Sequence, residues 1–79
     1  MNTDTRSLAA EWGREIKTRR KALKLGQVEL AEHLGVSQAT VSRWESGAMV
    51  PGTAMQARLV KRLGIDPKQL YDLVTKGAA

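Results

Sequence analysis

The sequence predicts an all-α fold in which five short helices form one compact domain. Three observations lead to this prediction. Apolar residues recur at spacings of three and four along most of the chain, capping residues and glycines separate these segments, and no segment alternates as a strand does. With 79 residues the chain has room for one domain, which we place at residues 1–79 with its core at about 8–75.

The first helix is expected from about Ser7 to Leu23. Ser7 can cap its start, and Glu11 lies in its early turns, where a negative charge suits the helix dipole. The residues on its predicted inner face recur at helical spacing: Leu8, Trp12, Ile16, Arg20 and Leu23. Trp12 is expected to lie in the core or at a dimer contact.

The second and third helices are expected over Gln27–Leu34 and about Gln38–Glu45, joined by a tight turn. Gly35 can take the left-handed conformation that closes a helix, and Ser37 is a good N-cap. The predicted inner residues of this unit are Val28, Leu30, Ala31, Leu34, Val36, Val41 and Trp44. Such a pair packs at a steep angle and leaves one face of its second helix exposed, as in helices that enter the DNA major groove.

The fourth helix is expected over about Ala54–Leu63, with Thr53 as its N-cap and Gly64 at its end. Its predicted core-facing residues are Met55, Leu59, Val60 and Leu63. Asp66 followed by Pro67 marks the start of a fifth helix that runs to Gly77. That helix carries Leu70, Tyr71, Leu73 and Val74, which either form a dimer surface or only close the core of the monomer.

The charge balance favours a polyanionic partner. The net charge is +5, the isoelectric point is near 10.1, and six of the thirteen basic residues lie between Arg14 and Lys24. Such a field attracts nucleic acid, although Arg14, Lys17 and Arg19 could equally form a solvated face. The chain has no cysteine, one histidine and no glycine-rich phosphate loop, so we expect no metal, no cofactor and no enzymatic activity. We see no signal peptide or membrane span and expect a cytoplasmic protein.

One segment carries a family resemblance. Gln27 is followed by Leu30-Ala31, then by Gly35-Val36-Ser37 and by Trp44-Glu45-Ser46-Gly47, and this combination closely resembles the Cro/C1-type (Xre) helix-turn-helix family. The resemblance extends from about Trp12 to Val74 and places the helix-turn-helix at 27–46. It implies a lambda-repressor-like DNA-binding fold whose partner is double-stranded DNA.

The resemblance also implies roles for individual residues. Gln27 would hold a DNA phosphate and brace the recognition helix, Gln38 would pair with adenine N6 and N7, and Arg43 would bind guanine or a phosphate. Arg20 and Glu45 would form a partly buried, structural ion pair. The expected DNA-contacting residues are Lys17, Arg19, Gln27, Ser37, Gln38, Ala39, Thr40, Ser42, Arg43 and Ser46.

The function expected from this resemblance is that of a sequence-specific transcriptional regulator. It would be a Cro/C1-like, phage-type repressor that binds a palindromic operator as a homodimer, without a small-molecule effector. Two alternatives remain. The chain could be an antitoxin-type module that binds a protein partner as well as its operator, or an architectural or excision-type factor that bends DNA.

Overall fold

The computed structural model describes the backbone of residues 7–78 and the side chains of residues 7–75. It contains the helices α1 (Leu8–Ala22), α2 (Gln27–Leu34), α3 (Gln38–Glu45), α4 (Thr53–Leu63) and α5 (Pro67–Ala78). The all-α, five-helix prediction is therefore confirmed. None of these helices combines the length and the apolar character needed to cross a membrane within the described part of the chain.

The helix ends follow from local sequence. The Ser7 hydroxyl accepts a hydrogen bond from the Ala10 N–H, and the Ser37 hydroxyl accepts one from the Thr40 N–H, each at 3.1 Å. Gly35 closes α2 with φ 74°, in the left-handed region that a glycine adopts without strain.

One predicted cap is wrong. Thr53 is the first residue of α4, and Gly52 is the N-cap, with no side chain to bond the free N–H groups. Both ends of α2 and α3, the end of α4 and the start of α5 are those expected, and the remaining helix ends differ from the expected ones by one residue, as the fraying of helix ends allows.

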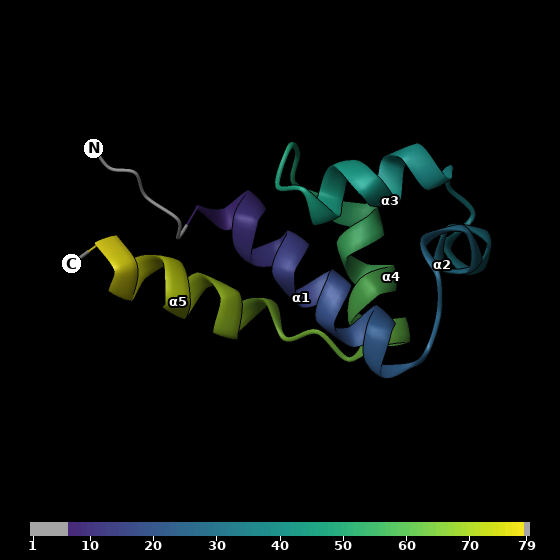
Figure 1. The fold of residues 1–79 in the computed structure, drawn as a ribbon. Helices are drawn as coiled ribbons and strands as arrows, with labels where there is room; N and C mark the ends of the chain where they lie inside the picture. Colours follow the sequence, from purple (N-terminus) through teal and green to yellow (C-terminus); the bar gives the residue numbers. More distant parts are fainter. Residues whose placement is uncertain (1–6, 79) are drawn as a thin grey trace.

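The long helix α1 organises the domain. It packs against α3, α4 and α5, and Figure 1 shows α3 along one side of α1 and α5 along the other. The hydrophobic core cluster is formed by side chains from all five helices and from the segment between α4 and α5: Trp12, Ile16, Leu30, Ala31, Leu34, Val41, Trp44, Leu59, Leu63, Ile65 and Leu70.

Three residues expected on inner faces are exposed. Leu23 and Val28 are each 55% exposed, and Val60 is 37% exposed. Leu23 follows the last residue of α1. Val28 and Val60 lie at the edges of their helical stripes, where none of the described helices covers them. Ile65, between α4 and α5, is buried although no periodic pattern pointed to it.

The contact between α1 and α3 is unusually close. A Cβ atom added to Gly13 would lie 2.3 Å from the carbonyl oxygen of Trp44 and 2.9 Å from that of Glu45. Both atoms are backbone, so only a residue without a side chain allows this approach. Gly13 thus fixes the distance between the central helix and α3.

Candidate nucleic-acid interface

One face of α3 is buried and the opposite face is open. Val41 and Trp44 pack into the core with 0% and 3% of their surface exposed. The exposed side chains of the helix and its N-cap follow the complementary spacing: Ser37, Gln38, Ala39, Ser42 and Arg43. All of them are among the predicted DNA-contacting residues, so the structure brings these five together on one surface.

The turn between α2 and α3 is held by hydrogen bonds at the end of α2. The Val36 N–H donates to the Ala31 carbonyl at 3.0 Å, and the Arg58 guanidinium donates to the Leu34 carbonyl at 2.9 Å. Arg58 thereby satisfies a carbonyl at a helix C-terminus, where a positive charge is favoured. These contacts hold the turn against the end of α2 and tie that end to α4.

At the start of α2, the backbone N–H of Gly26 donates to the Glu29 carboxylate at 2.7 Å. A glutamate three residues after the N-cap is the spacing of a capping box, so this contact could have been predicted from the sequence. Glu29 thus holds the end of α2 at which Gln27 lies.

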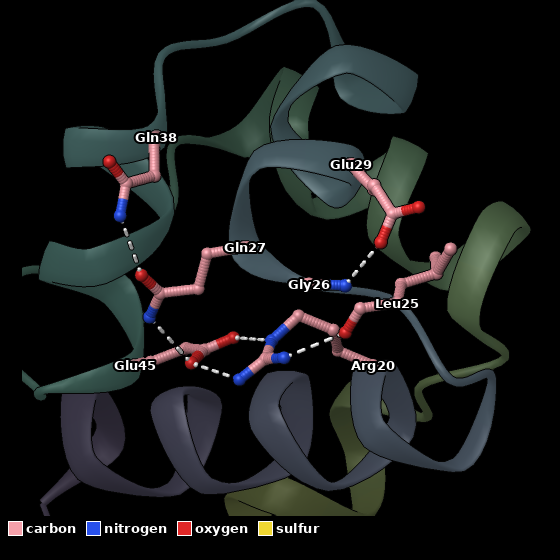
Figure 2. Close-up of polar contacts among 7 residues, drawn as sticks. All are labelled: Arg20, Leu25, Gly26, Gln27, Glu29, Gln38 and Glu45. Atoms are coloured by element: carbon pink, nitrogen blue, oxygen red, sulfur yellow. Dashed lines mark hydrogen bonds and ion pairs between the residues drawn. The ribbon is translucent and has the colours of Figure 1, made fainter.

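Four side chains from α1, α2 and α3 form a continuous polar chain, which Figure 2 shows. Arg20 Nε donates to Glu45 Oε2 at 2.6 Å and Arg20 Nη2 donates to Glu45 Oε1 at 3.0 Å. Gln27 Nε2 donates to Glu45 Oε1, and Gln38 Nε2 donates to Gln27 Oε1, both at 3.0 Å. This polar chain of side chains therefore links the central helix to the first residue of α3.

The Arg20–Glu45 pair is buried and fully charged. Their side chains are 9% and 4% exposed, and Arg20 Nη1 also donates to the Leu25 carbonyl at 2.8 Å. Burial alone would raise the pKa of Glu45, but hydrogen bonds from Arg20 and Gln27 and the charges of Arg20 and Lys17 outweigh it and lower that pKa. The hydrogen bond to Glu45 raises the pKa of Arg20 despite its burial.

The two predicted basic residues of α1 lie on different sides of that helix. Lys17 is exposed and lies one helical turn after Gly13, which contacts the backbone of α3, so it lies on the side of α1 that faces α3. Arg19, two residues later, points away by helical geometry. It donates to Glu15 at 2.7 Å and to the Leu63 carbonyl at the end of α4 at 3.2 Å. The structure therefore does not bring Arg19 to the open face of α3.

Thr40 and Ser46 make contacts within α3 and its cap. The Thr40 hydroxyl lies 3.0 Å from the Ser37 hydroxyl, and the exposed Ser46 hydroxyl donates to the Arg43 carbonyl at 3.0 Å. Thr40 is half-buried and supports the N-cap, whereas Ser46 lies at the opposite end of the exposed face.

The four apolar residues singled out in α5 divide into two groups. Leu70 is buried with 2% of its surface exposed and belongs to the monomer core. Tyr71 is 55% exposed, Leu73 is 37% exposed and Val74 is half-buried, so these three side chains form the open apolar edge of the helix. Leu70 must therefore be removed from the expected dimer surface.

Sequence reasoning missed several residues that position α3. Gly13, Arg58 and the Gln27–Glu45 contact were not anticipated. Gly13 does share helical spacing with Ile16 and Arg20, which marks it as facing the core. The partner of Arg58 is a backbone atom 24 residues away, so no local pattern could have found it.

Comparison with known proteins agrees with this geometry. A family model described as a helix-turn-helix domain matches residues 11–73, which cover well over half of the chain and include all of α2 and α3. No curated protein matches the chain significantly. The chain therefore belongs to this helix-turn-helix family of DNA-binding, typically non-enzymatic domains.

Proposed function

We propose that this protein is a sequence-specific transcriptional regulator, a Cro/C1-like repressor that reads the major groove of duplex DNA with α3. The observation that carries the proposal is the open face of α3, where Gln38, Ser42 and Arg43 stand opposite the buried Val41 and Trp44. An α-helix fits the major groove, and these side chains can donate to or accept from base edges.

Residues around α3 supply the phosphate contacts in this proposal. Lys17 lies on the side of α1 that faces α3, Gln27 opens α2, and Ser46 follows α3. Contacts of this kind fix the position of the recognition helix without carrying sequence information. Arg19 is not included, because its guanidinium contacts Glu15 and Leu63 on the side of α1 that points away from the open face of α3.

We further propose that the protein binds a palindromic operator as a homodimer. A single helix-turn-helix offers a small interface, and pairing two of them on half-sites about one helical turn apart raises the affinity. The exposed apolar edge of α5, formed by Tyr71, Leu73 and Val74, supports this surface as the dimer contact. A repressor of this kind acts where the DNA is, in a bacterial cytoplasm or in the host cell of a phage, and needs no cofactor or small-molecule effector.

The first test is selection of binding sites from random duplex DNA, carried out with the natural protein and with Arg43→Ala. Arg62→Ala is the matched control, because it removes the same charge from an exposed position on α4. We expect a palindromic motif in which Arg43→Ala relaxes one position per half-site, by about 1–3 kcal/mol if the contact is bidentate. Arg62→Ala should leave the motif unchanged.

Other results would favour other functions. Binding without a motif that vanishes as salt rises would reflect phosphate contacts only and would refute sequence-specific reading. Strong bending of the selected DNA without repression of a reporter would favour an architectural factor. Stoichiometric capture of the product of a neighbouring gene would favour an antitoxin.

A further inference from the structure

The polar chain between α1 and α3 has a direction that chemistry dictates. The ionised carboxylate of Glu45 can only accept hydrogen bonds, so the group that Gln27 turns toward it must be the amide nitrogen. The Gln27 oxygen must then face the other way, toward Gln38. Gln38 in turn must present its own amide nitrogen to that oxygen. The Glu45 carboxylate thus orients the carboxamide of Gln27, and the Gln27 carboxamide orients that of Gln38.

This order determines what Gln38 can offer to a ligand. One N–H of its Nε2 is used by Gln27, which leaves Oε1 and the second N–H. Gln38 is exposed, and its Oε1 has no hydrogen-bond partner among the described residues. The side chain therefore presents one acceptor and one donor outward from α3.

The two purines present different groups to such a side chain. Adenine shows a donor at N6 and an acceptor at N7 in the major groove, and these complement one acceptor and one donor. Guanine shows acceptors at both O6 and N7 and would place its O6 against the Gln38 oxygen. A carboxamide turned the other way, with both N–H groups outward, would instead match guanine.

From this geometry we infer that Glu45 is a positioning residue for base selection: acting through Gln27, it holds the Gln38 carboxamide in the orientation that selects adenine and rejects guanine. Since this inference rests on the proposed function, it applies to the base pair that Gln38 contacts. Glu45 itself does not need to touch DNA, and its side chain is buried against Arg20.

The constraint persists because Glu45 remains charged and cannot rotate away. Both of its oxygens are held by Arg20, whose guanidinium is anchored in turn to the Leu25 carbonyl. These contacts and the charge of Lys17 lower the pKa of Glu45 and keep it a pure acceptor at neutral pH. Reversing Gln27 would place its oxygen against that carboxylate, which is electrostatically unfavourable.

The test uses substitutions of Gln27, because removal of Glu45 would strand the buried charge of Arg20. Gln27→Met keeps the length of the side chain and removes both polar groups, so Gln38 becomes free to rotate. Gln27→Lys keeps a donor for Glu45 and offers a second donor to Gln38, which must then turn its oxygen inward and both N–H groups outward. Val28→Lys adds the same charge at a neighbouring exposed position, outside the polar chain, and is the matched control.

The readout is the ratio of affinities for two duplexes that differ only by A·T or G·C at one pair. The base pair to be varied is the one at which Gln38→Ala abolishes the preference of the natural protein for one base. Circular dichroism checks that each variant folds. The natural protein and Val28→Lys should favour adenine by about tenfold or more. Gln27→Met should lower this ratio to roughly threefold or less, and Gln27→Lys should invert it in favour of guanine.

A change in folding or in phosphate contacts alone would lower the affinity for both duplexes and leave their ratio unchanged. The inference is therefore overturned if Gln27→Met keeps the ratio of the natural protein, or if Gln27→Lys still favours adenine. It is also overturned if Gln38→Ala alters the preference at no base pair, a result that leaves the proposed function intact. Failure of the natural protein to select any motif would instead refute the proposed function.

Discussion

Replacement of Gly13 by alanine tests the packing that places α3. In an open helix this substitution stabilises a protein by about 1 kcal/mol, because alanine has the higher helix propensity. Here the new methyl group would meet two backbone carbonyl oxygens at 2.3 and 2.9 Å, and backbone atoms cannot rotate out of its way. α1 and α3 must move apart, and overpacking of this kind typically costs about 1–3 kcal/mol.

We therefore expect Gly13→Ala to destabilise the protein by roughly 2 kcal/mol, with a sign opposite to that of helix propensity. For a domain of this size, such a loss lowers the melting temperature by about 8–16 °C. Urea and thermal unfolding followed by circular dichroism and by the fluorescence of Trp12 and Trp44 would measure it. Thr18→Ala, at an exposed position of α1, is the control and should be neutral or slightly stabilising. A Gly13→Ala variant as stable as the natural protein would refute the reasoning.

Three further predictions concern the ion pair and two helix ends. Arg20→Met or Glu45→Leu alone should destabilise the protein by about 3–5 kcal/mol, because either leaves a buried charge unpaired, and the double variant should cost less than either. A double-mutant cycle in urea that gives additive losses would contradict this. The pKa of Glu45 is lower in the folded chain than its ordinary value of 4.5, so its contribution to stability is complete above that value and is lost as the pH falls through the folded-state pKa. The urea concentration at the unfolding midpoint should fall as the pH is lowered, and it should fall less steeply in the double variant. An equally steep fall in both proteins would exclude Glu45 as the cause of the pH dependence. Gly52→Ser should raise stability by about 0.5 kcal/mol, since a Cβ at this N-cap meets no atom within 4 Å and the hydroxyl can cap α4. Gly64→Ser should lower the stability by about 1 kcal/mol, because φ at this position is 71°, in the left-handed region that is unfavourable for residues with a side chain. If thermal unfolding shows that both substitutions stabilise the protein, or that both destabilise it, these roles of the two glycines would be contradicted.

Much of this protein is determined by interactions between near neighbours in the sequence. Ser37 caps α3 by accepting a hydrogen bond from the backbone N–H three residues downstream. Gly35 closes α2, and Pro67 begins α5. Capping and periodicity act over one or two helical turns, so the sequence predicts the number, type and order of the helices. The exposed face of α3 follows from the same periodicity once Val41 and Trp44 are assigned to the core.

The tertiary structure decided how far each apolar stripe is covered and where the long polar side chains lie. Val28 and Val60 have the spacing of core residues but stay exposed, while Leu70 is buried beside residues that stay exposed. Arg19 bonds a carbonyl 44 residues away, and Gln27 bonds a carboxylate 18 residues away. Periodicity states which side of a helix is apolar, but the coverage of that side and the partner of a flexible side chain depend on elements distant in the sequence. The orientation of Gln38 is such a property, because it is set where three helices meet.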